Sequence, residues 1–193
     1  MIENIEKYNL ILASGSPRRQ QFLMDLDIPF SVQLKSIDEH FPTTLKAEEI
    51  AEYLAKAKAD AFTELQPSDV LITADTIVWH KGRALNKPEN REEAYRMIHA
   101  LQDDRHDVIS AFCIKTNTTQ VVKSETTKVY FSALTDDEIW YYIDTYQPFD
   151  KAGAYGIQEW IGQVGISKIE GSYYNVMGLP TQLFYNTLKS VIK

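Results

Sequence analysis

The stretch NLILASGSPRRQQFLMDL (residues 9–26) predicts a strand, a tight loop and a helix in direct succession. Residues 8–13 form an apolar run of strand length, and Ser16 followed by Pro17 is typical of the N-cap and first residue of a helix. Apolar side chains then share one helical face: Phe22, Leu23 and Leu26. A strand that leads through a loop into a helix is the building unit of α/β proteins.

The same loop carries charge where a helix does not favour it. Arg18 and Arg19 fall in the first helical turn, where unpaired N–H groups are already partly positive, and each misplaced cation costs about 0.3–1 kcal/mol. These arginines, the N–H groups and the hydroxyls of Ser14 and Ser16 could together hold a phosphate chain. The loop is not a Walker A loop, since no Gly-Lys-Ser/Thr follows. The alternative is a capped surface helix whose arginines point into water or pair with acids.

Composition narrows the class of protein. The chain has 193 residues, 44% of them hydrophobic, which is enough for a core in one domain (residues 1–193) or in two closely packed lobes. The net charge of −7 argues against a general nucleic-acid surface. We find no signal peptide and no apolar run of the roughly 18 residues that span a membrane, and the single Cys113 fits a reducing compartment. We therefore expect a cytoplasmic protein without a nucleic-acid or membrane partner.

Strands and helices alternate along the rest of the chain. Apolar and alternating runs predict strands at residues 29–34, 69–80, 84–87, 106–115 and 119–132, the last two joined as a hairpin. Helical periodicity and capping patterns predict helices at residues 43–65, 90–101 and 135–143 and from residue 180 onward. Residues 153–178 are rich in glycine and are expected to mix loops with short strands. This order predicts an α/β fold with a mixed, twisted sheet and flanking helices.

Two carboxylates are candidates for metal binding or acid–base chemistry. Asp75 interrupts an apolar strand, where burial of an unpaired carboxylate would be costly. At a sheet edge or strand end it could bind Mg²⁺ or take a proton from water, and the alternative is a structural pair with a lysine or a turn formed with Thr76. Glu39 is a second candidate ligand, although a charged loop explains its surroundings equally well.

Two lysines and one glutamine complete the candidate site. Lys58 lies partly toward the buried face of the long helix, where a snorkelling lysine is the commoner case. Lys87 precedes a proline that restrains its backbone, and it could balance phosphate charge, although lysines in plain loops also precede prolines. Gln158 ends a glycine-flanked motif and offers a donor and an acceptor to a base edge, but a tight turn would use the same residues. The histidines lack metal-ligand spacing, and no serine-hydrolase elbow is present.

Motifs in five stretches resemble, in order, the Maf family of nucleoside triphosphate pyrophosphatases. They are LASGSPRR (residues 12–19), ADTIV (74–78), LNKP (85–88), KAGAYGIQ (151–158) and GSYYNVMGLP (171–180). The resemblance implies an α/β fold similar to that of inosine triphosphate pyrophosphatases, with two lobes around a cleft, and a homodimer. It also implies cleavage of a nucleoside triphosphate to the monophosphate and pyrophosphate with a divalent cation, Mg²⁺ or Mn²⁺.

The resemblance also implies roles for single residues. Asp75 matches the family's proton acceptor, and Arg18, Thr76 and Gln158 match its specificity positions. The tail GAYGIQ resembles the branch that acts on dTTP and UTP, whose 4-keto group Gln158 could read. This sequence departs from the usual family pattern at a few positions, namely Asn86, Ala111 and Met177, and Ala111 in place of glycine would either narrow the cleft or have no effect.

These expectations combine into one mechanism and one rival. Arg18, Arg19, Lys58 and Lys87 would hold the triphosphate, while Glu39 and Asp75 would hold the metal. Asp75 would deprotonate a water that attacks the α-phosphorus, with pyrophosphate leaving. A variant of this function is housecleaning, with damaged or modified nucleotides preferred. The rival is a nucleotide-binding regulatory protein that acts on cell division and septum formation through a partner; it would keep the cations but would not need Asp75 set against a metal.

Overall fold

A seven-stranded mixed sheet forms the centre of the protein, in the strand order β2-β1-β3-β5-β6-β7, with β4 paired to β3. The computed structural model describes residues 2–192. The strands are β1 (Asn9–Leu12), β2 (Ser31–Val32), β3 (Asp69–His80), β4 (Arg83–Leu85), β5 (Arg105–Lys115), β6 (Gln120–Phe131) and β7 (Ile166–Glu170). β1 runs parallel to β2 and β3, and the other pairs are antiparallel. The expected mixed α/β sheet is therefore confirmed.

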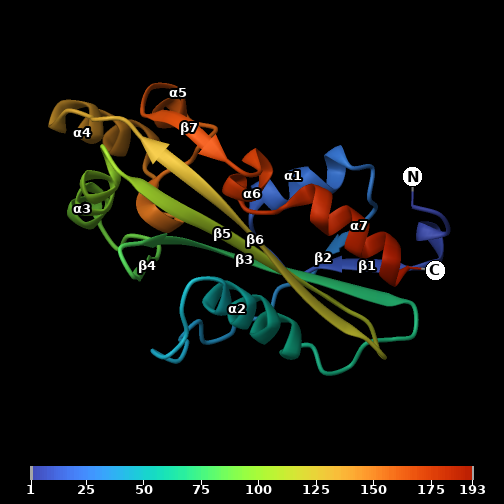
Figure 1. Ribbon diagram of the computed structural model, residues 1–193. Helices are drawn as coiled ribbons and strands as arrows, with labels where there is room; N and C mark the ends of the chain where they lie inside the picture. Colours follow the sequence, from blue (N-terminus) through green and yellow to red (C-terminus); the bar gives the residue numbers. More distant parts are fainter. Residues whose placement is uncertain (1, 193) are drawn as a thin grey trace.

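Helices cover both faces of the sheet (Figure 1). They are α1 (Pro17–Asp25), α2 (Glu48–Asp60), α3 (Arg91–Leu101), α4 (Asp136–Tyr146), α5 (Trp160–Val164), α6 (Tyr173–Met177) and α7 (Thr181–Val191), with 3-10 turns η1 (Ile5–Lys7) and η2 (Ala152–Ala154). Figure 1 shows α2 on one side of the long strands and α1, α6 and α7 on the other. Among residues 2–192, no helix is long and apolar enough to cross a membrane.

Separate hydrophobic clusters hold these layers together. One joins α1 and α7 to the sheet around Phe22, Phe112 and Phe184, and a second places α2 on the opposite face. The third lies between α3, α4 and the far ends of the long strands, with Tyr142 fully buried in it. The first and third clusters are two lobes built on the same long strands, because β3 and β5 contribute buried residues to both (Figure 1).

Several expected boundaries were wrong. The helix expected at residues 43–65 covers only Glu48–Asp60; it cannot begin earlier, because Ala47 has φ 47° and ψ −118°, which no α-helix tolerates. The strand expected at residues 29–34 shrinks to the two-residue, exposed edge strand β2. The glycine-rich region 153–178 contains two short helices, α5 and α6, in addition to strand β7.

A gap in the sheet sets the position of the site. β1 pairs with residues 69–72 of β3, and β4 pairs with residues 78–80 on the same flank. Between these stretches, in the described part of the chain, residues 73–77 have a strand neighbour only on the β5 side. The sequence analysis considered a sheet edge or a strand end for Asp75. In the structure Asp75 lies instead in the middle of a strand that lacks a neighbour on one flank. Successive side chains alternate between the faces of a strand, so Asp75 points toward α2 and Thr76 toward α1 and α6.

Candidate active site

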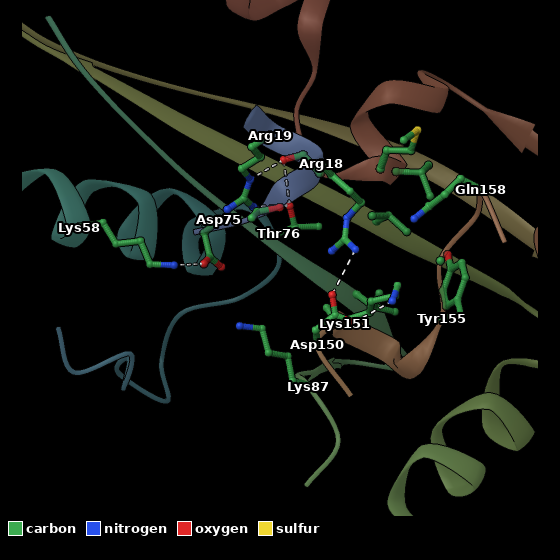
Figure 2. Close-up of a pocket in the computed structure, with 18 residues that line it drawn as sticks. Arg18, Arg19, Lys58, Asp75, Thr76, Lys87, Asp150, Lys151, Tyr155 and Gln158 are labelled. Atoms are coloured by element: carbon green, nitrogen blue, oxygen red, sulfur yellow. Dashed lines mark hydrogen bonds and ion pairs between the residues drawn. The ribbon is translucent and has the colours of Figure 1, made fainter. Parts of the chain in front are cut away.

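A cleft opens at the gap beside β3 (Figure 2). It consists of two adjoining pockets that share Arg19, Lys58 and Lys87 as lining residues. Every site residue expected from the sequence lines one pocket or the other: Ser14, Ser16, Arg18, Arg19, Glu39, Lys58, Asp75, Thr76, Lys87 and Gln158. The fold thus brings together side chains from α1, α2, β3 and several loops that are far apart in the sequence.

Lys58 links the two carboxylates of the cleft. Its Nζ lies 2.6 Å from Oδ1 of Asp75 and 2.9 Å from Oε1 of Glu39. The Asp75 side chain is 13% exposed, so this pair compensates a charge that would otherwise be costly to bury. Partial burial alone would raise the pKa of Glu39, but the hydrogen bond from Lys58 and the charges of Lys58, Lys87 and Arg19 lower that pKa below its usual value. Glu39 is therefore ionised at neutral pH.

The pair Glu39 and Asp75 fits one kind of metal site. No cluster of three or more His, Cys, Asp or Glu residues that could hold a metal occurs among residues 2–192. Mg²⁺ usually takes one or two protein carboxylates and completes its shell with water and substrate phosphates. Two carboxylates that converge on one ammonium group, beside a cationic pocket, match that requirement for a phosphate-bound cation.

Arg19 is anchored by the protein itself. Its Nε donates to the Gly178 carbonyl at 2.9 Å, Nη1 to the Ala74 carbonyl at 2.9 Å, and Nη2 to the Thr76 hydroxyl at 3.0 Å. A weaker bond of 3.4 Å joins Nη1 to Ser14 Oγ. Burial lowers the pKa of Arg19, while Asp75 opposes that shift. Arg19 thus closes the flank of β3 by satisfying a carbonyl that has no strand partner there.

Arg18 is held more loosely and is oriented into the cleft. Its Nη1 lies 3.3 Å from Oδ2 of Asp150, and the Arg18 side chain is 26% exposed (Figure 2). Partial burial would raise the pKa of Asp150, but Lys151 and Arg18 together lower it. An ion pair with an exposed aspartate stabilises little, so the guanidinium can exchange Asp150 for another anion at small cost.

The two serines of the loop do not form the side-chain cap that the sequence predicts for α1. Ser16 does occupy the N-cap position before Pro17, but its side chain makes no capping hydrogen bond. Instead Oγ of Ser14 accepts from the Ser16 N–H at 3.3 Å and stabilises the loop before the helix. Because the first-turn N–H groups of α1 receive no side-chain cap from Ser16, they remain available to a ligand anion.

The remaining expected residues surround the pocket. Thr76 contacts Arg19 and faces α6, whereas Gln158 and Lys87 are exposed on loops at the rim. Within the described residues, the side chains of Gln158 and Lys87 make no hydrogen bond or ion pair to the protein. Lys87 still acts on Glu39 through its charge. A ligand can therefore contact the side chains of Gln158 and Lys87 without first displacing a hydrogen bond or ion pair within the described residues.

A charged clamp behind Gln158 was missed by the sequence reasoning. The buried Lys151 lies 2.7 Å from Asp150 and 3.0 Å from Glu159, and the Tyr142 hydroxyl donates to Glu159 while accepting from the Gly156 N–H. A Cβ at Gly156 would lie 2.9 Å from Glu159 Cδ and 3.0 Å from Lys151 Cε, so a side chain there would have to displace the clamp. The signal in the sequence was the charged pair Asp150 and Lys151 at the start of the glycine-rich motif, and the contact of Lys151 with Glu159 needs the folded loop.

Tyr155 in the same segment also lines the cleft. Its hydroxyl lies 2.6 Å from Nε2 of His106, and both residues are buried. Burial lowers the pKa of His106 to about 3, so this imidazole stays neutral at physiological pH. Ala111, by contrast, lies opposite Asp75 within the α2 core and lines neither pocket, so it does not narrow the cleft.

Known proteins resemble this chain over its whole length. The family model described as "Maf-like protein" matches residues 9–191. The dTTP/UTP pyrophosphatase of Flavobacterium johnsoniae is 52% identical over 191 residues, covering 98% of both chains, and that of Parabacteroides distasonis is 52% identical over 98% of this chain and 99% of its own. A HAM1 protein from Coxiella burnetii has a similar fold, with a TM-score of 0.50 and 16% identity over 95% of this chain and 99% of its own. The chain therefore belongs to the Maf family.

Proposed function

We propose that this protein is a nucleoside triphosphate pyrophosphatase that acts on dTTP and UTP. The activity named for its relatives at about half identity supports this assignment. The observation that carries it in this chain is the position of Asp75, a carboxylate in the middle of the sheet that opens onto a pocket lined by arginines and lysines. A protein that only bound nucleotides would need the cations but not this carboxylate, and no observation favours a role in septum formation.

The cations of the cleft have different roles in binding the phosphates. Arg18 exchanges Asp150 for phosphate oxygens, and its planar guanidinium grips two of them. Lys87 adds charge from the rim without having to break a pair first. Lys58 lies beside Asp75 and neutralises charge on the phosphate nearest the reacting atom. Such fixed charges contribute most of the catalysis in phosphoryl transfer, because they oppose charge that develops in the transition state.

Asp75 is the base in this proposal. Its carboxylate orients a water molecule toward the α-phosphorus and accepts the proton as the bond to pyrophosphate breaks. Glu39 and Asp75 would hold the divalent cation, Mg²⁺ or Mn²⁺, which when bound polarises phosphate oxygens and lowers the charge barrier to attack. Since Lys58 bridges both carboxylates, it is positioned to move onto the substrate when they bind a cation.

Specificity for 4-keto pyrimidines is assigned to the rim. The Gln158 amide can donate to a 4-keto oxygen, and the clamp on Lys151 holds the segment that carries it. A homodimer, a cytoplasmic location and a preference for damaged or modified nucleotides stay predictions of the sequence.

The test is pyrophosphate release from dTTP, UTP, CTP, GTP and 7-methyl-GTP with Mg²⁺ or Mn²⁺. We expect turnover of dTTP and UTP, and a loss of about 10²–10⁴-fold in Asp75→Asn, the range expected when a general base is removed. The matched control is Asp144→Asn, which removes an exposed carboxylate outside the cleft and should keep wild-type turnover. Near-normal activity of Asp75→Asn would exclude Asp75 as the base, and release from other bases alone would exclude the assigned specificity.

A further inference from the structure

The motif GSYYNVMGLP contains a fully buried polar side chain, Asn175 on α6. Its Nδ2 donates to the Val108 carbonyl at 3.0 Å and to the Thr127 hydroxyl at 2.9 Å, and its Oδ1 accepts from the Ser110 N–H at 3.2 Å. All of the hydrogen-bonding capacity of the amide hydrogens is thereby used, so the amide has one orientation. Asn175 thus ties α6 to β5 and β6 directly behind the wall of the cleft.

A chain of hydroxyl groups leads from Asn175 to the cleft. Ser110, also fully buried, donates from Oγ to the Asn175 carbonyl at 2.8 Å, and its Oγ lies 2.7 Å from the hydroxyl of Thr76. Thr76 in turn accepts from Nη2 of Arg19 at 3.0 Å and lies 3.3 Å from the Gly178 carbonyl. Ser110 lines neither pocket, whereas Thr76 lines the one that contains Gln158.

The directions of these hydrogen bonds follow from chemistry. A carbonyl oxygen can only accept, so the Ser110 proton is used on the Asn175 carbonyl, and the Thr76 proton must point to Ser110 Oγ. The reverse arrangement, in which Ser110 donates to Thr76 and Thr76 donates to the Gly178 carbonyl at 3.3 Å, leaves the 2.8 Å contact between Ser110 Oγ and the Asn175 carbonyl without a proton and uses both lone pairs of the Thr76 oxygen. Only the first arrangement places a proton in both short contacts, and in it the Thr76 proton points into the protein. Arg19 takes one lone pair of the Thr76 oxygen, which leaves one lone pair for the cleft.

We propose that Ser110 and Asn175 are positioning residues that hold Thr76 as a pure hydrogen-bond acceptor toward the substrate. Thr76 then selects a substrate group that donates an N–H or O–H, and it disfavours one that offers only a lone pair. In a pyrimidine nucleotide such donors are the imide N–H of the base and the hydroxyls of the sugar. This inference rests on the proposed function and deepens it, because it assigns the donor and the acceptor of one hydrogen bond between the protein and the substrate.

The test is a double-mutant cycle on kcat/KM for UTP with the wild type, Ser110→Ala, Thr76→Val and the double variant. A neutral hydrogen bond is worth about fivefold in such a ratio, so we expect Ser110→Ala to lose about fivefold. In the Thr76→Val background the same change should cost less than about twofold, because residues that act through one group are not additive. Equal losses in both backgrounds, or no loss in a folded Ser110→Ala protein, would overturn the proposal.

Controls separate positioning from stability. Thr73→Val removes another buried hydroxyl of β3, one that donates to the Ala55 carbonyl on the opposite face, and should lower the melting temperature without changing kcat/KM. Ser110→Thr keeps the hydroxyl and should restore activity, which also covers the case that Ser110→Ala does not fold. If the wild type turns over no nucleotide, the proposed function itself fails, and that outcome is distinct from an additive cycle.

Substrate analogues identify the donor that Thr76 accepts from. N3-methyl-UTP lacks the imide N–H, and 2′,3′-dideoxy-UTP lacks the sugar hydroxyls. Removal of the group read by Thr76 should cost the wild type several-fold more than it costs Thr76→Val. If the loss with N3-methyl-UTP is smaller in Thr76→Val than in the wild type, Thr76 accepts from the imide N–H. If the loss with 2′,3′-dideoxy-UTP is the one that is smaller in Thr76→Val, Thr76 accepts from a sugar hydroxyl. If both penalties are the same in both proteins, Thr76 accepts from neither and the proposal is wrong.

Discussion

Neighbouring arginines in the first turn of α1 have different tasks. Arg19 is partly buried and donates to carbonyls of β3 and of Gly178, whereas Arg18 is paired only with the exposed Asp150. The electrostatic cost of two cations at a helix start is therefore met in two ways. Arg19 is compensated by carbonyl dipoles of the fold, and Arg18 by a carboxylate that a ligand can replace.

Substitution of each arginine should separate these tasks. Arg18→Ala should leave the free energy of unfolding within about 1 kcal/mol of the wild type, because exposed ion pairs stabilise little, and should lower kcat/KM for UTP. Arg19→Lys should lower the free energy of unfolding by about 2–3 kcal/mol, because an ammonium cannot reproduce the guanidinium fork and buried carbonyls lose a charged donor. Urea unfolding and steady-state kinetics measure both quantities.

The matched control for both arginine variants is Arg83→Ala. Arg83 is exposed on β4 and lines neither pocket, so both stability and kcat/KM should stay at the wild-type level. Equal stability of Arg19→Lys and Arg18→Ala would contradict the distinction between an anchored and an exchangeable arginine.

At the scale of elements, the segment from Asp150 to Glu159 is shaped by one buried lysine. Lys151 is 10% exposed at its side chain and contacts both end residues of the segment, so its ammonium closes the loop that carries Tyr155 and Gln158. The Tyr142 hydroxyl completes the closure by donating to Glu159 and accepting from the Gly156 N–H, which joins the loop to α4. The rim of the cleft is thus fixed by charge rather than by a regular helix or strand.

Lys151→Met tests this closure. The variant keeps the volume of the side chain but leaves the Glu159 carboxylate without its cation, and breaking such a pair costs about 3 kcal/mol or more. We expect that loss in urea unfolding together with a lower kcat/KM. Lys168→Met, at an exposed lysine paired with Glu170, should leave both unchanged. A fully stable Lys151→Met protein would show that apolar packing alone holds the segment.

At the scale of the whole molecule, the buried His106 couples stability to pH. Its pKa in the folded protein is about 3, against 6.5 for an ordinary histidine, because burial opposes the charged form. Below pH 6.5 the unfolded chain takes up a proton that the folded protein does not. The free energy of unfolding should therefore fall by about 1.4 kcal/mol per pH unit from this group as the pH drops from 6.5 toward 3.

Urea unfolding between pH 4 and pH 8 measures this dependence. His106→Gln removes the titrating group and keeps a polar partner for the Tyr155 hydroxyl. Below pH 6.5 the free energy of unfolding of the variant should fall less steeply with pH than that of the wild type, by about 1.4 kcal/mol per pH unit. Parallel curves for the two proteins would mean that another group controls the acid sensitivity.

Local sequence determined much of this protein. The strand and helix around residues 9–26, the long strands, the capping box of α4 and the mixed sheet were all predicted, because periodicity and caps act over a few residues. The five motifs also indicated the family, and every site residue expected from the sequence lines the cleft. These features are short-range patterns or fixed residue types, so they can be read without the fold.

Only the tertiary structure decided what these side chains do for one another. It placed Asp75 in a gap of the sheet, where β1 has ended and β4 has not begun, rather than at a strand end. It anchored Arg19 by hydrogen bonds to the protein and left Arg18 paired with an exposed aspartate, although both line the cleft and are neighbours in the sequence. The physical reason is that burial, pairing and hydrogen-bond direction depend on neighbours far along the chain, and the strand register and helix packing alone select those neighbours.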